Sequence, residues 1–169
     1  MEIIKKICLD ACSVINLINC NNLHSVLSLE NTTFFIGPAV YDEVVKLPEQ
    51  EVIINTFISK GVIEIYDGEI NIDLVDSFFE TYQLGDGETE TVAICVQNGF
   101  TMCCDDRLAR AMAETVIGED KTMGSLRLLK FTVQAGILLC KDAFVAYRLM
   151  ISEGGFLPKN ISNHFFCSS

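Results

Sequence analysis

The sequence has few of the residues on which many familiar active sites depend. It contains two histidines, His24 and His164, and neither stands beside an acidic cluster. A histidine-based metal site and a Ser-His-Asp triad therefore have almost no support. The cysteines form no CxxC pair, so the spacing of a zinc site is missing. There is also no Walker loop and no GxGxxG motif, and the glycines of residues 85–87 stand in a segment too short and too acidic to cradle phosphate.

Long apolar runs are missing as well. No stretch is apolar enough to span a bilayer, and the charged start at residues 1–6 leads into a strand-like run rather than a signal peptide. We therefore expect a soluble cytoplasmic protein with no membrane partner. The 8 cysteines lie mostly within apolar segments. We expect them to be reduced and mostly buried.

Positive charge is scarce too. The chain carries 12 basic and 23 acidic residues, which gives a net charge of −11. This balance argues against non-specific binding of nucleic acid, which needs a basic surface. It does not exclude a nuclease, because acids gathered around metal ions add to the negative count and the bound metals reverse the local field.

What the sequence does contain is an alternation of strand-like and helix-like segments. We predict strands at residues 3–9, 33–36 and 62–66, a further strand that ends on Asp105 and Asp106, and a short final strand at 116–117. The predicted helices span residues 11–18, 22–29, 39–45, 49–59, 73–82, 86–98, 108–114, 122–134, 142–152 and 158–166. Such alternation predicts a parallel sheet between layers of helices, and a chain of 169 residues fits a single domain over residues 1–169.

Acidic residues recur at one edge of this predicted sheet. Asp10, Asp105 and Asp106 follow strands directly, where open α/β sheets place their sites. Glu43, Glu88 and Glu90 stand in helices that follow connections on the same edge. Each acid alone has a simple explanation, such as a helix cap for Asp10 or a solvated helix edge for Glu43. Four separate segments that deliver acids to one edge are harder to explain in this way.

Clustered carboxylates predict a cation. Carboxylates a few Å apart raise each other's pKa unless a cation neutralises them. Hard oxygen ligands without histidine suit Mg²⁺ or Mn²⁺ rather than zinc. One or two such ions can promote hydrolysis of a phosphodiester.

Four segments in this order resemble the motifs of PIN-domain ribonucleases, and the resemblance covers nearly the whole chain. They are residues 9–17 (LDACSVINL), 38–44 (PAVYDEV), 87–93 (GETETVA) and 104–110 (CDDRLAR). Residues 123–126 (MGSL) and 155–156 (GF) resemble the C-terminal part of a prokaryotic PIN subgroup related to VapC-type toxins. The resemblance implies a three-layer α/β/α fold with a central, mainly parallel sheet of four or five strands.

The resemblance also implies a site and its roles. Asp10, Glu43, Glu90 and Asp106 would hold Mg²⁺ or Mn²⁺ for cleavage of single-stranded or structured RNA. Glu88 and Asp105 are further metal ligands in this interpretation; Glu90 is preferred to Glu88 by its spacing to the apolar run, and Asp105 either assists Asp106 or caps the following helix.

Three residues near the acids are expected to contact the substrate. They are Ser13, Arg107 and Arg110, and for the arginines a structural ion pair is an equal alternative. Where family members often have Ser or Asn, this chain has Cys12, which is a poor partner for Mg²⁺.

VapC-like proteins commonly pair with a small antitoxin and often dimerise, so the resemblance implies an antitoxin partner and a homodimer. Two alternatives stay open. One is a catalytically silent PIN-fold module that binds RNA or protein. The other is a different acid-based phosphoryl-transfer protein, although Cys12 and Ala11 stand where a dehalogenase-type fold and a receiver domain, respectively, need an acid.

Overall fold

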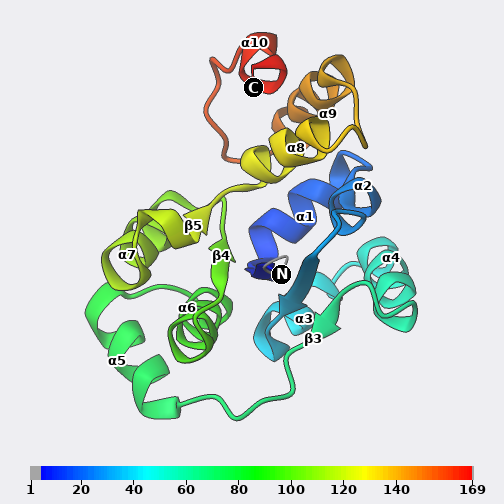
Figure 1. The fold of residues 1–169 in the computed structure, drawn as a ribbon. Coiled ribbons are helices and arrows are strands. Elements are labelled where there is room, and N and C mark those ends of the chain that lie inside the picture. Colours follow the sequence, from blue (N-terminus) through cyan, green and yellow to red (C-terminus); the bar gives the residue numbers. More distant parts are fainter. Residues whose placement is uncertain (1–4, 169) are drawn as a thin grey trace.

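Five strands form one sheet in which every neighbouring pair is parallel, in the order β3-β2-β1-β4-β5 (Figure 1). The computed structural model describes residues 5–168. The strands are β1 (Lys5–Leu9), β2 (Thr32–Ile36), β3 (Glu64–Ile65), β4 (Thr101–Cys103) and β5 (Thr122–Met123). The predicted parallel sheet is confirmed. Residues 3 and 4 of the first predicted strand lie outside the described residues.

Helices connect the strands and cover both faces of the sheet. They are α1 (Ala11–Asn19), α2 (Leu23–Leu27), α3 (Pro38–Val44), α4 (Pro48–Ser59), α5 (Ile72–Tyr82), α6 (Asp86–Asn98), α7 (Arg107–Ile117), the 3₁₀ helix η1 (Glu119–Lys121), α8 (Ser125–Gln134), α9 (Cys140–Ser152) and α10 (Asn163–Cys167). Within residues 5–168, no helix combines the length and the apolar character that crossing a bilayer requires.

Three assignments near the C-terminus differ from the prediction. Residues 116–117 are the last turn of α7, which ends at Gly118 with a φ of 95°. The fifth strand is instead Thr122–Met123, paired with Met102 and Cys103, in a segment that we assigned to the start of a helix. The last helix covers Asn163–Cys167 rather than residues 158–166.

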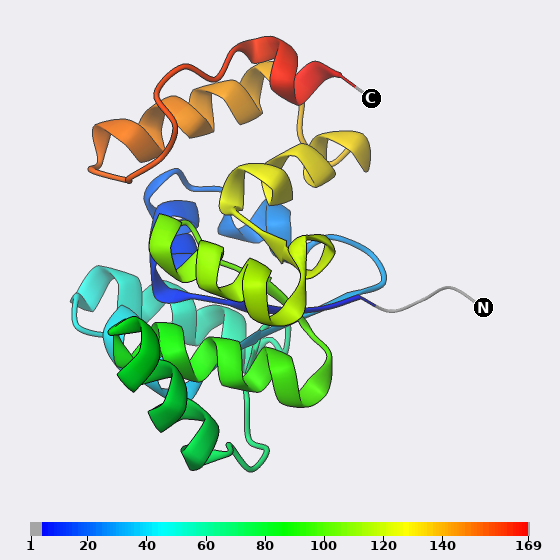
Figure 2. The same cartoon turned by 90° about the vertical axis from the view of Figure 1, so that its left-hand side faces the viewer.

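The sheet separates two apolar cores. In β1, Ile7 and Leu9 belong to the core shared with α1, α2, α8 and α9, whereas Cys8 belongs to the core shared with α6 and α7. Figure 2 shows this layering: the green helices α5 and α6 lie on one side of the dark-blue strand, and the yellow, orange and red helices α8 to α10 lie on the other. Alternate side chains of each strand thus point into different layers.

A disulfide joins α9 to α10. It links Cys140, the first residue of α9, to Cys167. The expectation of reduced thiols is therefore wrong for this pair. The other 6 cysteines are free, and of these only Cys12 is partly exposed.

The strand order creates a switch point at the carboxyl end of the sheet, and we call the space outside the ends of β1 and β4 the crevice. From β1 the chain continues outward through β2 and β3, and β4 and β5 then lie on the opposite side of β1. The connections therefore diverge between β1 and β4, which is where open parallel sheets bind their ligands. Asp10 follows β1 and Asp105 and Asp106 follow β4, so the fold brings these aspartates to the same crevice.

Candidate active site

Asp10 stands directly after β1, at the carboxyl end of the sheet. Its backbone N–H donates to the carbonyl of Cys103 at the end of β4 (2.9 Å), and the residue precedes α1 without a capping hydrogen bond from its side chain. Only 2% of the residue is exposed. The thiols of Cys12 and Cys104 both donate to Oδ2, at 2.8 and 3.3 Å. Burial raises the pKa of Asp10, and the two thiol hydrogen bonds offset this only in part.

Asp106 and Asp105 have different structural roles. Asp106 is the N-cap of α7, where Oδ1 accepts from the N–H of Ala109 at 2.8 Å. This leaves Oδ2 free of hydrogen bonds to residues 5–168. Asp105 does not cap the helix, contrary to that alternative. It is buried and accepts from the Asn16 amide (2.8 Å) and from both the N–H and the hydroxyl of Ser125 (2.8 and 2.6 Å). Asp105 therefore links the end of β4 to α1 and α8. Asp106 is the aspartate better placed to bind a ligand.

Glu88 belongs electrostatically to the same group of acids. It is half-buried in the first turn of α6, where its carboxylate accepts from the N–H of Gly85 at 2.8 Å. Its pKa is raised, first by burial and then by the negative charges of Asp10, Asp106 and Glu43. Three carboxylates, from α3 and from the ends of β1 and β4, thus act on Glu88 in α6.

Glu43 reaches this group from the last turn of α3. Its side chain is exposed, and a Cβ added to Gly87 in α6 would lie 3.5 Å from Oε2 of Glu43. The absence of a side chain at Gly87 therefore lets α3 and α6 pack closely at the point where their acids meet.

Glu90 faces a different neighbour. Its Oε1 accepts from the N–H of Ala39 at 2.8 Å and thereby caps the start of α3. Its pKa is raised by burial first, and the acids that raise it further are Asp42 and Asp86 rather than Asp10. Any side chain at Gly37 would collide with this carboxylate. Of the two glutamates, the geometry favours Glu88 as the residue of the crevice, which reverses our preference for Glu90.

The acids of the crevice have no cationic partner among residues 5–168. The ion pair in that part of the chain joins Arg110 to Glu114 at 4.0 Å. Asp10 is thus a buried carboxylate whose only side-chain donors are two thiols, which are weak donors. Uncompensated buried charge of this kind is costly unless a cation binds. The oxygen donors therefore fit a divalent metal ion, although Cys12 and Cys104 add two sulfur atoms beside them.

A groove of about 920 Å³ extends from Asp105 toward the C-terminal segment. The basic residues that line it are Arg107, Arg110, Arg127 and Lys159. Phe156 lines it as well and is 96% exposed, which is unusual for an aromatic ring. Arg110 is partly engaged, because it pairs with Glu114 and donates to the carbonyl of Cys104 at 3.4 Å. Arg127, Lys159 and Phe156 were missed in the sequence as members of this surface, because they lie far from the acidic motifs along the chain.

Ser13 is not where a substrate could touch it. The residue is fully buried, and its hydroxyl has no hydrogen-bond partner in the described part of the chain. The expected role of Ser13 in substrate binding is therefore wrong, because the adjacent Cys12, not Ser13, faces the crevice.

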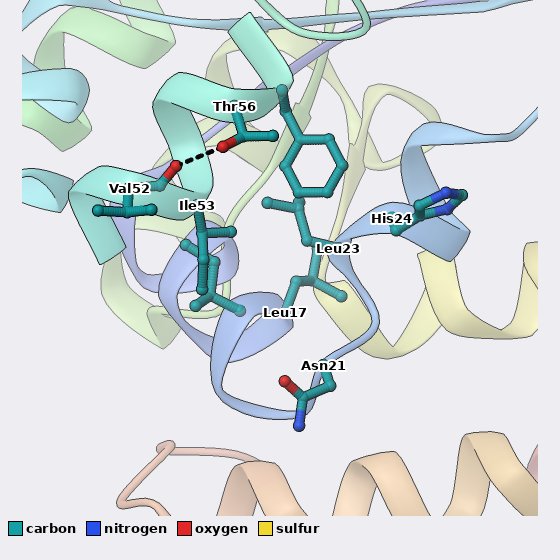
Figure 3. Close-up of a pocket in the computed structure, with 9 residues that line it drawn as sticks. Leu17, Asn21, Leu23, His24, Val52, Ile53 and Thr56 are labelled. Atoms are coloured by element: carbon teal, nitrogen blue, oxygen red, sulfur yellow. Dashed lines mark hydrogen bonds between the residues drawn. The ribbon is translucent and has the colours of Figure 1, made fainter. Parts of the chain in front are cut away.

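A separate apolar pocket lies between α1, α2 and α4 (Figure 3). It has a volume of about 290 Å³ and is lined by residues such as Leu17, Leu23 and Phe57. Its only ionisable residue is His24. The pocket opens at the end of α1 away from Asp10 and brings no acid to the crevice.

Comparison with known protein families gives one match. A family model described as a PIN domain matches residues 6–167. No curated protein and no solved structure matches the chain significantly. The match covers the parallel sheet, the acids of the crevice and the C-terminal helices, and the PIN domain is a nuclease-type fold. The chain therefore belongs to the PIN-domain family.

Proposed function

We propose that this protein is a metal-dependent endoribonuclease that hydrolyses phosphodiester bonds of single-stranded or looped RNA. The observation that carries the proposal is the group of carboxylates at the crevice. They add to the effect of burial in raising the pKa of Glu88, and they lack a cationic partner among residues 5–168. In a nuclease-type fold, such a group is explained by a divalent metal ion.

Asp10, Glu43, Glu88 and Asp106 are the residues that would hold Mg²⁺ or Mn²⁺. When bound, the ion would activate water and neutralise charge on the scissile phosphate. Glu90 keeps α3 in place through Ala39 and so positions Glu43. Asp105 keeps the end of β4 in place through Asn16 and Ser125 and so positions Asp106.

The groove beside Asp105 supports a nucleic-acid substrate. Its arginines and lysine stand out in a chain with a net charge of −11, because they gather next to the acids instead of being spread over the surface. Arg107, Arg127 and Lys159 would bind phosphates, and the exposed ring of Phe156 would stack on a base. Stacking on an exposed ring requires an unpaired base, which favours single-stranded or looped RNA.

Cleavage of a mixed RNA pool tests the proposal. We expect fragments with Mn²⁺, none with EDTA, and none with the Asp10→Asn variant in Mn²⁺. Asp76→Asn is the matched control, because it makes the same substitution at an exposed aspartate of α5. A single-stranded DNA pool in parallel tests the choice of RNA. Cleavage that survives both EDTA and Asp10→Asn would contradict the proposal.

A second candidate function rests on the two thiols. Cys12 and Cys104 occupy the hydrogen-bonding positions around Asp10, and sulfur is a poor ligand for Mg²⁺. A PIN-fold module that binds RNA without cutting it would fit this arrangement. RNA binding without Mn²⁺-dependent cleavage, in a protein that melts cooperatively, would favour it.

The antitoxin partner, the homodimer and the relation to VapC-type toxins stay proposals. A small protein that is encoded by an adjacent gene, co-purifies with this chain and blocks cleavage would support the antitoxin partner. The mass of the protein in solution, measured by light scattering, tests the homodimer.

A further inference from the structure

Three side chains at the crevice have the chemistry of a soft metal site. They are Asp10 after β1, Cys12 in the first turn of α1 and Cys104 directly after β4. One ligand atom from each lies within 4.8 Å of the other two. Asp10 and Cys104 are almost completely buried, while Cys12 is partly exposed.

The three ligand atoms already lie close to the corners of a tetrahedron. Zinc–sulfur bonds of about 2.3 Å and a zinc–oxygen bond of about 2.1 Å require about 3.8 Å between the sulfurs and about 3.6 Å from oxygen to each sulfur. The two Sγ atoms are 3.8 Å apart. Oδ2 of Asp10 lies 2.8 Å from Sγ of Cys12 and 3.3 Å from Sγ of Cys104. To reach this geometry, Oδ2 would have to move about 0.8 Å further from Sγ of Cys12 and about 0.3 Å further from Sγ of Cys104.

The surroundings of Cys12 suit a bound thiolate. The backbone N–H of Asp105 points at Sγ of Cys12 from 3.3 Å, and N–H donors of this kind stabilise negative sulfur. A metal ion binds cysteine as a thiolate, so binding between the two sulfurs would release protons to the buffer.

We propose that Asp10, Cys12 and Cys104 form a binding site for one thiophilic divalent ion, Zn²⁺, with a fourth position left open to water. Asp10 belongs both to this site and to the carboxylate group of the crevice. Zn²⁺ bound through the sulfurs therefore withdraws Asp10 from a hard ion. The consequence, which rests on the proposed nuclease function, is that Zn²⁺ inhibits cleavage supported by Mn²⁺.

Cobalt provides a readout that does not depend on activity. We expect Co²⁺ added to the full, reduced chain to give a sulfur-to-metal charge-transfer band and the visible bands of a tetrahedral ion, and Zn²⁺ to remove both. Cys12→Ser and Cys104→Ser should each lose the charge-transfer intensity of one thiolate. Each should also weaken Zn²⁺ binding by at least about 100-fold, since the loss of a mere outer partner costs about 10- to 100-fold.

Two variants serve as matched controls. Cys20→Ala removes a buried free cysteine at the far end of α1, and the Cys140→Ser/Cys167→Ser pair removes the thiols that reduction of the disulfide would expose. Both should keep the cobalt bands. Cys12→Ser changes a partly exposed side chain, so it remains informative if the buried Cys104→Ser variant fails to fold.

The outcomes separate this site from the nuclease. Thiolate bands in a protein that never cleaves RNA would support the zinc site and contradict the proposed function. Octahedral Co²⁺ spectra without charge transfer, or bands that persist in both Cys12→Ser and Cys104→Ser, would overturn the zinc site. If cleavage occurs, Zn²⁺ should inhibit the wild type at lower concentration than it inhibits Cys12→Ser, and equal inhibition would contradict the competition.

Discussion

At the scale of single residues, Asp10 reduces the stability of the metal-free fold. Burial raises its pKa above the unfolded value of 3.8, so the folded protein holds this proton to higher pH than the unfolded chain does. The free energy of unfolding therefore falls as pH rises from about that value through the folded pKa, and the deficit is complete above it. A residue that weakens its own fold is typical of a functional site.

The first prediction is that Asp10→Asn melts at a higher temperature than the wild type without metal at pH 7. Each pKa unit of the shift corresponds to about 1.4 kcal/mol of stability regained. The difference should shrink as pH is lowered through the folded pKa and vanish below about 3.8, where the wild-type carboxyl is protonated in both states. Melting curves followed by circular dichroism across this pH range provide the measurement. A variant less stable than the wild type at every pH would show that the ionised Asp10 stabilises the fold.

The second prediction compares two half-buried glutamates of the same helix. Glu88→Gln should reduce the rise in melting temperature that millimolar Mn²⁺ produces, because it removes a charge that acts on Asp10, Glu43 and Asp106. Glu90→Gln should keep most of that rise, because its carboxylate caps α3 through Ala39. Thermal melts with and without Mn²⁺ compare the two variants. A larger loss in Glu90→Gln would show that Glu90, rather than Glu88, is the metal ligand.

The choice between these glutamates shows a limit of sequence reasoning. The spacing in the sequence places Glu88 and Glu90 about 200° apart on a helix and so predicts that they face different neighbours. The sequence could not show which face of α6 points toward the other acids, because the helix is buried on a wide surface that includes Thr89, Thr91 and Val92. Two hydrogen bonds of the folded chain decide which glutamate lies at the crevice. Glu88 accepts from the N–H of Gly85, and Glu90 accepts from the N–H of Ala39 in α3.

At the scale of elements, Asp105 connects three of them. It follows β4 and accepts from Asn16 in α1 and from Ser125 at the start of α8. These partners are 89 and 20 residues away along the chain, so no local pattern pairs them. Gly124 must lack a side chain here, because a Cβ would lie 2.8 Å from Oδ1 of Asp105.

The third prediction compares the adjacent aspartates. Asp105→Asn should destabilise the protein by about 2–4 kcal/mol, because an amide group would face donors that now meet a charged acceptor. Asp106→Asn should cost less than about 1 kcal/mol, because its remaining oxygen can still cap α7. Urea unfolding measures both variants. Equal stability of the two would contradict the role of Asp105 as a connector.

The elements that the sequence mispredicted are the ones with the fewest local signals. β5 has 2 residues, Thr122 and Met123, which is too short to show an alternation. It exists because it pairs with β4. The cystine between Cys140 and Cys167 is likewise a contact across 27 residues that no spacing rule identifies.

At the scale of the whole molecule, the fold class was predictable while one surface was not. Alternating segments were sufficient for a parallel sheet, and the strand ends were sufficient to gather Asp10 and Asp106. The groove depends on how the segment around Phe156 lies beside α7 and α8, and the sequence does not show this. A chain with a net charge of −11 therefore carries a locally basic surface that its composition conceals.

The fourth prediction concerns the salt dependence of RNA binding at this groove. If Arg107, Arg127 and Lys159 each contact one phosphate, the logarithm of the binding constant should fall with that of salt concentration with a slope of about −2. Arg127→Ala should make this slope shallower by about 0.7. Lys121→Ala, which lies beside Gly99 outside the groove, should not change it. Fluorescence anisotropy with single-stranded RNA in EDTA measures the slopes. An unchanged slope for Arg127→Ala would contradict binding of RNA phosphates by this groove.

The most direct test of the central claim is the position of Mn²⁺ in a crystal, found from its anomalous scattering. We predict an ion between the ends of β1 and β4, with oxygens of Asp10, Glu88 and Asp106 around it at about 2.0–2.2 Å or through one water. The same peak should be absent from Asp10→Asn. A crystal of the wild type soaked in millimolar Mn²⁺ that shows no peak in this crevice would contradict the account.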